Sequence, residues 1–300
     1  MMNKAIASPG RTREILDKYG FTFKKSLGQN FLIDANILDK IVAASGIDET
    51  CGVIEIGPGI GALTERLAQK SKKVAAFEID GRLIPVLKDV LGGYGNVSII
   101  HRDFLKVDIR KTIAEEFQDA GDLLIVGNLP YYVTTRMIMK CLTEDLPVSR
   151  MVFMVQKEVG DRLSAKPDSK DYGSLSIAVQ YYTVPEIVTK VPKTAFMPRP
   201  KVDSIVVRLT KREHPPVGVA DETFFFTVTR SCFAQRRKTI MNNLMHQMPG
   251  GKEKKEEILH ALLQAGIEPE RRGESLSIEE FARLANGLYP VFGEHGKDRE

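Results

Sequence analysis

The sequence predicts an α/β protein in which a mostly parallel sheet of seven strands, the last one antiparallel, is followed by a smaller all-α domain. Between residues 53 and 156, short apolar runs alternate with segments of helical periodicity. These runs are apolar at nearly every position, as in strands that helices cover on both faces. Beyond residue 218 only helical patterns occur, and 300 residues exceed what one compact core usually serves. We therefore expect two domains.

Five strands are expected in the first half of the chain, each of them a short apolar run. Two parallel strands joined through a helix need a right-handed crossover, which places helices on both faces of the sheet. The two clearest intervening helices are expected over 63–70 and 82–91. The expected strands span residues 53–57, 73–80, 96–103, 122–128 and 151–156.

Two later strands complete the expected sheet, over residues 178–191 and 201–210. No long helix separates them, so we expect the sheet to end in an antiparallel pair. The segment His-Pro-Pro-Val-Gly at 214–218 then interrupts the pattern and is expected to mark the domain boundary. The predicted domains are residues 1–213, with a helical segment over 1–50, and residues 214–300.

The C-terminal domain is expected to contain three helical segments, over 223–244, 254–266 and 277–288. The last one begins with Ser277 and Glu280, at the spacing of a capping box. In this motif each side chain bonds the backbone N–H of the other residue, so the start of this helix is well specified.

Composition and cysteine usage exclude several classes of protein. The net charge is +4, and no apolar run approaches the ~18 residues that a membrane-spanning helix needs. The first residues lack the apolar core of a signal peptide, so we expect a cytoplasmic protein with no membrane partner. Cys51, Cys141 and Cys232 form no Cys-x-x-Cys pair, and the five histidines lack metal-binding spacing. We expect buried, reduced cysteines and no metal.

A glycine-rich segment, Glu-Ile-Gly-Pro-Gly-Ile-Gly at 55–61, joins the first expected strand to its helix. Glycine lets the backbone turn sharply here and approach a ligand closely. The segment also fits the dinucleotide pattern Gly-x-Gly-x-x-Ala through Gly57, Gly59 and Ala62, with Glu78 about 20 residues further on. A tight turn without any ligand is the alternative interpretation.

Polar residues or glycine follow four successive strands of the expected sheet. Gly57, Glu78, Asp103 and Asn128 lie at or near the ends of these strands. The carboxyl ends of parallel strands line one crevice, where open α/β sheets bind ligands. Glu78 can accept hydrogen bonds from ribose hydroxyls, and Asp103 can accept one from an adenine amino group. The pattern therefore predicts a nucleoside site.

The turn Asn128-Leu129-Pro130-Tyr131 follows the fourth expected strand directly. The exocyclic amine of adenine is a poor nucleophile because its lone pair is delocalised into the ring. An Asn side-chain oxygen and a backbone carbonyl can accept both amine hydrogens and localise that lone pair toward an electrophile. Pro130 would hold the turn rigid, and Tyr131 offers a face on which a base stacks. The turn predicts methyl transfer from a sulfonium to an adenine amine, without a strong general base.

In combination, several segments resemble the ribosomal RNA adenine N6,N6-dimethyltransferases, and among them the bacterial small-subunit enzymes. The resemblance covers nearly the whole chain. It implies a Rossmann-like methyltransferase sheet with S-adenosylmethionine as cofactor. It also implies a monomeric enzyme that dimethylates two adjacent adenines in a loop near the 3′ end of 16S rRNA, within the 30S subunit. The segments that carry it are KKSLGQNFLID (24–34), EIGPGIGALT (55–64), FEID (77–80), RDFL (102–105), GNLPYYVTT (127–135), AFMPRPKVDSIVVRL (195–209) and FAQRRKTIMNNL (233–244).

The same resemblance assigns roles to individual residues. Asn30 stands where some relatives carry His, and since both are polar we expect no change of function. The expected cofactor contacts, which come from the resemblance and from the glycine-rich segment, are Asn30, Leu32, Gly57, Gly59, Glu78, Asp103 and Asn128. The catalytic residues are Asn128, Leu129, Pro130, Tyr131 and Phe196. The resemblance implies that Phe196 helps to hold the target adenine opposite the tyrosine; an aromatic residue packed in the core is the alternative.

Basic residues gather near the N-terminus, between residues 186 and 212, and on the helix expected over 223–244. Clustered cations neutralise phosphates and give salt-dependent RNA binding. An ordinary solvated surface is the alternative for each cluster. The residues predicted to bind RNA are Lys24, Lys25, Arg199, Lys201, Arg230, Arg236, Arg237 and Lys238.

The sequence leaves three alternative functions. A 23S rRNA adenine dimethyltransferase that confers macrolide resistance would share the chemistry, but such relatives generally have shorter C-terminal regions. A ribosome-assembly factor that acts mainly by binding would share the basic clusters. A dinucleotide oxidoreductase would share the glycine loop, but nothing after Asn128 predicts a hydride-acceptor site.

Overall fold

The computed structural model describes residues 6–24 and 28–293, and the chain divides into two compact units. The first unit comprises Met1–Gly160 and Val184–Lys211, and the second comprises Asp161–Thr183 and Arg212–Glu300. The last division lies close to the boundary expected at 213/214. The predicted pair of consecutive domains differs from this arrangement in one respect, because residues 161–183 group with the C-terminal helices and not with the sheet.

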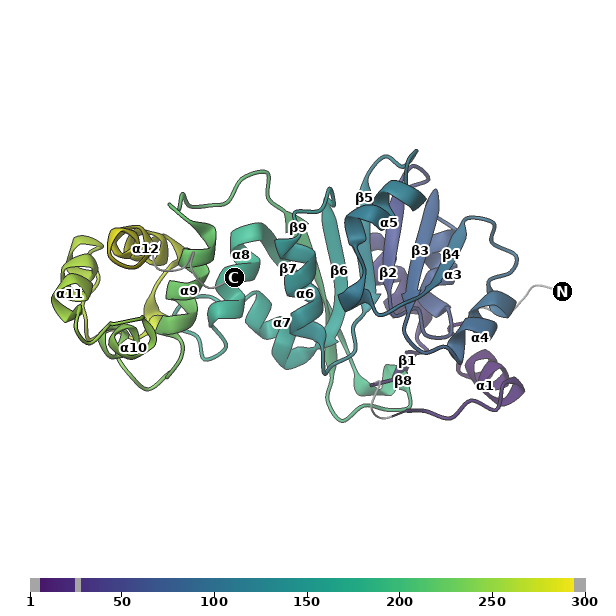
Figure 1. Cartoon of the computed structure of the whole chain (residues 1–300). Coiled ribbons are helices and arrows are strands. Elements are labelled where there is room, and N and C mark those ends of the chain that lie inside the picture. Colours follow the sequence, from purple (N-terminus) through teal and green to yellow (C-terminus); the bar gives the residue numbers. More distant parts are fainter. Residues whose placement is uncertain (1–5, 25–27, 294–300) are drawn as a thin grey trace. The chain divides into compact units, whose positions relative to one another are not determined.

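The first unit is built around a sheet of seven strands in the order β4-β3-β2-β5-β6-β9-β7 (Figure 1). The pairs β2–β3, β2–β5, β3–β4 and β5–β6 are parallel, whereas β9, the last strand in the sequence, pairs antiparallel with β6. This topology confirms the predicted sheet. The strands are β2 (Gly52–Ile56), β3 (Lys73–Glu78), β4 (Val97–His101), β5 (Leu123–Asn128), β6 (Arg150–Gln156), β7 (Thr183–Val191) and β9 (Ser204–Lys211).

Both faces of the sheet are buried, which explains the continuous apolar runs in the sequence. One hydrophobic core joins residues of α2, α3 and α4 to strand residues such as Val53 and Val126. The neighbouring strand residues Ile54 and Ile125, which point to the other face, are completely buried as well. The helices of this unit are α1 (Pro9–Lys18), α2 (Ala35–Ser45), α3 (Ala62–Ala68), α4 (Leu83–Val90), α5 (Ile109–Glu116) and α6 (Thr134–Thr143), and α7 (Lys157–Leu163) crosses into the second unit.

A second, two-stranded sheet brings the N-terminal segment beside a late part of the chain. β1 (Phe31–Leu32) pairs antiparallel with β8 (Phe196–Met197), and Leu32 lies opposite Phe196. Asp34 then starts α2, because its carboxylate accepts hydrogen bonds from the first free N–H groups of the helix. The pairing fixes the segment that precedes α2 against the body of the first unit.

The strand expected over 178–191 is wrong in its first part. Residues 178–182 form the end of α8 (Ser174–Tyr182), and β7 begins only at Thr183. Val179 and Tyr181 are buried on this helix. A short run that is apolar at most positions suits a buried helix as well as a buried strand, so its periodicity cannot distinguish them.

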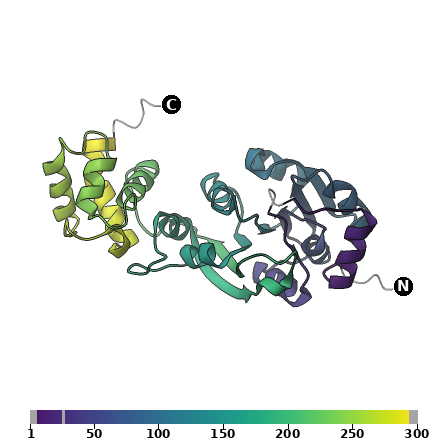
Figure 2. The ribbon, with the colours of Figure 1, turned by 90° about the horizontal axis from the view of Figure 1, so that it is seen from below.

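The second unit is helical, with α8 joined by four later helices whose green-to-yellow ribbons gather in one bundle (Figure 2). Its core is aromatic: the ring of Tyr181 lies with its centroid 5.3 Å from those of Phe225 and Phe226. The predicted capping box is confirmed, because Ser277 and Glu280 bond each other's backbone N–H. The later helices are α9 (Glu222–Cys232), α10 (Ile240–Gln247), α11 (Lys255–Gln264) and α12 (Ile278–Phe292).

The single helix expected over 223–244 is also wrong. α9 ends at Cys232 and α10 begins at Ile240, so residues 233–239 form a connection. The buried side chain of Asn243 donates hydrogen bonds to the carbonyls of Cys232 and Gln235, which stabilises this turn. Arg236, Arg237 and Lys238 therefore lie in the connection and not on a helix.

Within residues 6–24 and 28–293, no helix is long and apolar enough to cross a membrane. Among the same residues, no three His, Cys, Asp or Glu side chains are grouped as a metal site. Cys51, Cys141 and Cys232 are buried and unpaired, as predicted.

Candidate active site

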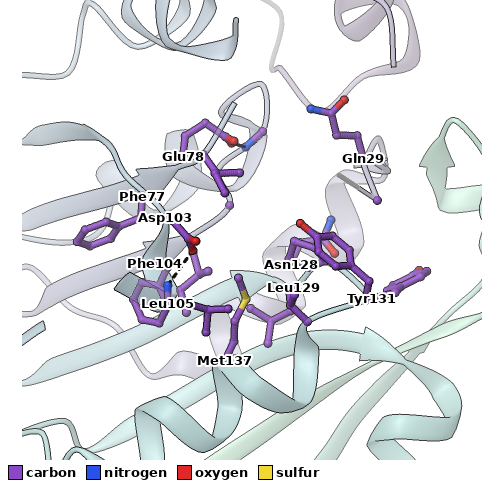
Figure 3. Close-up of a pocket in the computed structure, with 18 of the residues that line it drawn as sticks. Gln29, Phe77, Glu78, Asp103, Phe104, Leu105, Asn128, Leu129, Tyr131 and Met137 are labelled. Carbon is purple, nitrogen blue, oxygen red and sulfur yellow. Dashed lines mark hydrogen bonds between the residues drawn. The ribbon is translucent and has the colours of Figure 1, made fainter. Parts of the chain in front are cut away.

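A cavity of about 360 Å³ lies at the carboxyl ends of β2, β3 and β5, in the first unit (Figure 3). The loop after β2, the end of β3, the short helix η2 (Phe104–Lys106) after β4 and the turn after β5 form its wall. The volume lies in the range of small-molecule sites. The predicted residues that the structure brings together there are Asn30, Gly57, Gly59, Glu78, Asp103, Asn128, Leu129, Pro130 and Tyr131.

The glycine loop forms a bare stretch of backbone in the cavity wall. Gly57 and Gly59 have φ angles of 72° and 60°, in the left-handed region that favours glycine. A Cβ on Gly59 would lie 2.9 Å from the ring of Phe31, which is too close. The N–H of Gly57 donates to the carbonyl of Phe77 and fixes the loop to β3. Gly57 and Gly59 therefore place no side chain of their own between this backbone and a ligand.

Glu78 and Asp103 lie on one side of the cavity, and Asn128 and Tyr131 lie on the other (Figure 3). Glu78 is 6% exposed, and its carboxylate accepts hydrogen bonds from the N–H groups of Gly59 (3.3 Å) and Asp80 (2.8 Å). Burial outweighs these bonds and raises the pKa of Glu78 to about 7. This carboxyl group can therefore change its charge near neutral pH.

Asp103 is held by the turn that it starts. Its Oδ1 accepts a 3.0 Å hydrogen bond from the N–H of Leu105, at the beginning of η2 (Figure 3). Among the described residues, no donor contacts its Oδ2. The side chain is thus fixed and still has one acceptor atom for a ligand.

The Asn128 side chain has one defined orientation. Its Nδ2 donates a 3.0 Å hydrogen bond to the carbonyl of Asn30, so its Oδ1 is the atom left to accept from a ligand. The Leu129 N–H donates to Met154 in β6, whereas the Leu129 carbonyl accepts no hydrogen bond from the described residues. The Pro130 carbonyl, by contrast, accepts bonds from Val133 and Thr134. Two acceptors, Oδ1 of Asn128 and the carbonyl of Leu129, are therefore available side by side in the chain.

Tyr131 is anchored by a residue that the sequence did not identify. Its hydroxyl lies 2.7 Å from Oγ of Ser204, a completely buried residue at the start of β9. Burial raises the pKa of Tyr131, so the phenol stays neutral at physiological pH. Ser204 occurs in the segment 195–209 that supports the family resemblance, but nothing in the sequence placed it beside Tyr131.

A second group that the sequence did not identify, formed by Gln29, Asp80 and Arg82, fixes another part of the cavity wall. Gln29 lines the cavity, and its Nε2 donates a 2.7 Å hydrogen bond to Asp80. Arg82 contacts the same carboxylate through Nε (2.9 Å) and Nη2 (2.6 Å). These bonds, the ones from Arg82 first, lower the pKa of Asp80 to about 2. The polar residues of the segments 24–34 and 77–80 were the available signal for this contact.

Two predicted site residues do not line the cavity. Leu32 and Phe196 are each 4% exposed and belong to the hydrophobic core, where they face each other across the β1–β8 pair. Their apolar side chains bury more surface by packing there than they would at a solvent-filled wall. Phe196 therefore does not stand opposite Tyr131 at the cavity. The neighbouring residues Asn30 and Phe31 line it instead.

Most of the residues predicted to bind RNA are exposed. Arg236 is exposed as well, but its guanidinium already has partners: it donates to the carbonyls of Lys170 and Tyr172 and pairs with Glu274. Lys25 lies outside the described residues. The other exposed residues of this set are Lys24, Arg199 and Lys201 in the first unit, and Arg230, Arg237 and Lys238 in the second.

Comparison with known proteins places this site in a family. Residues 20–288 match the family model of the ribosomal RNA adenine dimethylases. The chain is 65% identical to the "Ribosomal RNA small subunit methyltransferase A" of Geobacillus thermodenitrificans, across 97% of this chain and 99% of that protein.

Two solved structures resemble the fold over most of the chain. A dimethyladenosine transferase from Plasmodium falciparum has a TM-score of 0.71 at 28% identity, covering 89% of this chain and 98% of that one. The 23S rRNA methyltransferase ErmE has a TM-score of 0.65 at 27% identity, covering 86% and 99%. From the family match and the high identity to its relatives, the chain belongs to the ribosomal RNA adenine dimethylase family.

Proposed function

We propose that this protein transfers methyl groups from S-adenosylmethionine to the N6 amines of two adjacent adenines in a loop near the 3′ end of 16S rRNA, in the 30S subunit. The observation that carries the proposal is the pair of free acceptors at Asn128 and Leu129 on the wall of the cavity. The 65% identity to a small-subunit methyltransferase supports the choice of RNA. We propose that the enzyme acts as a cytoplasmic monomer.

The residues around the cavity fit S-adenosylmethionine. Gly57 leaves space beside the backbone, because a Cβ there would have only the Asn128 carbonyl, at 3.6 Å, within 4 Å of it. Glu78 would hold the ribose hydroxyls through its carboxylate, each oxygen of which accepts only one hydrogen bond from the part of the chain that the structure describes. Asp103 would hold the adenine amino group through Oδ2, which no donor of the described residues contacts. When bound, the cofactor supplies an electrophilic methyl group on a sulfonium.

The chain's own residues would prepare the target amine. Oδ1 of Asn128 and the carbonyl of Leu129 accept its two hydrogens, and Tyr131 stacks on the base. These contacts localise the nitrogen lone pair and orient it, so positioning and electrostatics supply the rate enhancement. A methylated adenine retains one N–H, so the second transfer needs only one of the two acceptors. The amine releases each proton to water once it is methylated.

Exposed basic residues would bind the RNA backbone. In the first unit these are Lys24, Arg199 and Lys201, and in the second they are Arg230, Arg237 and Lys238. Their charges give affinity that falls with salt, while the turn after β5 selects an unstacked adenine.

The proposal is tested by incubating the protein with radiolabelled S-adenosylmethionine and purified subunits that lack the modification. We expect label in 30S particles but not in 50S particles, and two adjacent dimethylated adenines when 16S rRNA is mapped. Label in 23S rRNA would favour the alternative large-subunit activity. Absence of label in both particles would overturn the proposal.

A further inference from the structure

Three basic side chains belong to the cavity wall without having a role in the proposed chemistry. Arg102 follows β4, Lys106 lies in η2, and Arg136 lies in the first turn of α6. All three are exposed, and η2 lies beside α6 in the first unit. They therefore form a positive rim around part of the cavity mouth.

None of these three side chains has an ion-pair or hydrogen-bond partner in the part of the chain that the structure describes. Other arginines of the same unit are neutralised, for example Arg82 by Asp80 and Arg150 by Asp122. Unpaired like charges at one mouth repel each other, and a bound anion would relieve that repulsion. The rim thus presents an anion site.

The cofactor is a poor match for this rim. S-adenosylmethionine carries one negative group, its carboxylate, and two positive groups, its sulfonium and its ammonium. Its net charge is therefore positive, and three unpaired cations would repel it. Glu78 and Asp103, the acidic residues of the wall, already account for its nucleoside part. The ligand of the rim must therefore be another anion that reaches the same mouth.

The start of α6 adds to the positive potential. α6 has no acidic residue in its first turn, and no side chain of residues 6–24 or 28–293 caps its N-terminus. Its first N–H groups accordingly have no side-chain acceptor, and Arg136 belongs to the same turn. Tyr132, which also lines the cavity, is 57% exposed and offers an aromatic face between Tyr131 and this helix. Free N–H groups, a guanidinium and an exposed ring together suit a nucleic-acid strand.

We propose that Arg102, Lys106 and Arg136 form a phosphate-binding rim that holds the phosphodiesters on the two sides of the target adenosine. This inference rests on the proposed function and extends it. Arg136 and the N-terminus of α6 hold one flanking phosphate, and Arg102 and Lys106 hold the other. Extruding a base from its stack costs a few kcal/mol, and contacts to its flanking phosphates offset that cost.

The test measures binding of a fluorescent single-stranded oligoribonucleotide with a central adenosine, by anisotropy over a range of salt concentrations. The variants are Arg102→Gln, Lys106→Gln, Arg136→Gln and their combination. Each single change should lower the slope of log affinity against log salt by about 0.7, and the triple variant should bind roughly tenfold more weakly at low salt. Arg136→Lys, which keeps the charge, should retain the wild-type slope.

Two comparisons make the result specific to the rim. Lys70→Gln removes an exposed charge before the start of β3, at the amino ends of the strands and away from the cavity, and should leave binding unchanged. An oligoribonucleotide with uncharged methylphosphonate linkages beside the adenosine should bind wild type and triple variant equally. The affinity for S-adenosylmethionine, measured by calorimetry, should not fall in any variant, because the rim cations repel its net positive charge.

Wild-type salt slopes in the three rim variants would overturn the inference, as would a loss of cofactor affinity as large as the loss of RNA affinity. Failure of the proposed function has a different signature. The wild-type protein would then leave both ribosomal subunits unlabelled while the rim variants still altered the salt slope.

Discussion

The side-chain amide of Asn128 donates a 3.0 Å hydrogen bond to the backbone carbonyl of Asn30, a residue 98 positions earlier in the chain. The acceptor is a backbone atom, so substitution of the Asn30 side chain leaves it in place. The bond directs the Oδ1 of Asn128 away from Asn30 and makes it available to a ligand. The N-terminal segment thus orients the group that we propose to activate the target amine.

Asn128→Ala should lower kcat for methyl transfer to 30S subunits by about 100- to 1000-fold, because one of the two amine acceptors is lost. Most of the affinity for S-adenosylmethionine should remain, since Glu78 and Asp103 are intact. Steady-state kinetics and calorimetry measure the two effects. Asn36→Ala, on the exposed side of α2, is the matched control. Wild-type kcat in Asn128→Ala would exclude the assigned role.

Ser204 should act on catalysis only through Tyr131. Tyr131→Phe and Ser204→Ala each remove the same 2.7 Å hydrogen bond, so the double variant should be little worse than either single one. The coupling in a double-mutant cycle of kcat/KM should be about 1 kcal/mol. Tyr131→Ala, which also removes the stacking face, should be far less active than Tyr131→Phe. Additive effects of the first two changes would show that the bond does not position the ring.

Cofactor affinity should increase as the pH rises through about 7. Burial raises the pKa of Glu78 to about 7, and only its carboxylate form accepts two ribose hydroxyls. Below that pH, the protonated group loses acceptor strength. Glu78→Gln should bind about 10- to 100-fold more weakly at pH 8 and should lose most of the pH dependence. Calorimetric titrations between pH 6 and 8.5 test this, and an unchanged pH profile in Glu78→Gln would contradict it.

Glu55→Gln should stabilise the free protein at alkaline pH. Glu55 is 1% exposed in β2, neither carboxylate oxygen has a hydrogen-bond partner among the described residues, and burial raises its pKa to about 8. Between pH 4.5 and 8 the folded state therefore holds a proton that the unfolded state releases, so this group lowers stability as the pH rises. At pH 8.5 the gain should reach a few kcal/mol, since each pKa unit is worth about 1.4 kcal/mol.

Urea unfolding at pH 5 and pH 8.5 measures this effect, which should nearly vanish at the lower pH. Glu49→Gln, at an exposed carboxyl, should have no effect at either pH. A gain of equal size at both pH values would point to packing and not to ionisation.

Neighbouring arginines in the second unit should have opposite roles. Arg236→Ala removes hydrogen bonds to two backbone carbonyls and should lower the free energy of unfolding by about 1 kcal/mol. Arg237→Ala should leave stability unchanged but should weaken RNA binding, because its exposed side chain is predicted to contact phosphate. Thermal unfolding and filter binding distinguish the two effects. Equal destabilisation by both changes would contradict this assignment.

The sequence predicted the sheet well because strands buried on both faces leave a continuous apolar signal. It also predicted the cavity residues that follow strands, since parallel topology brings strand ends together whatever the details of packing. It failed where two structures have the same local pattern. Residues 178–182 are apolar enough for a helix or a strand, and the break at 233–239 depends on Asn243, which lies further along the chain.

The residues that hold Tyr131 and Asp80 in place could not be predicted from the sequence, because their contacts depend on how distant parts of the chain pack. Ser204 reaches Tyr131 only because β9 lies beside β6, and Gln29 meets Asp80 only because the N-terminal segment passes the end of β3. Phe196 shows the opposite case: an aromatic residue in a motif of the family packs into the core. A motif specifies which residues occur together, whereas three-dimensional packing decides which of them reach the cavity.

Residues 161–183 belong to the helical unit, although residues of the sheet unit precede and follow them in the chain. This arrangement has a consequence for protein engineering. Because this piece belongs to the helical unit, the two units are joined at three points of the chain and not at one. A chimera with a single crossover at residue 211 would combine Tyr181 of one parent with Phe225 and Phe226 of the other, in the middle of one aromatic core. Exchange of the helical unit between family members therefore requires that both pieces move as one cassette.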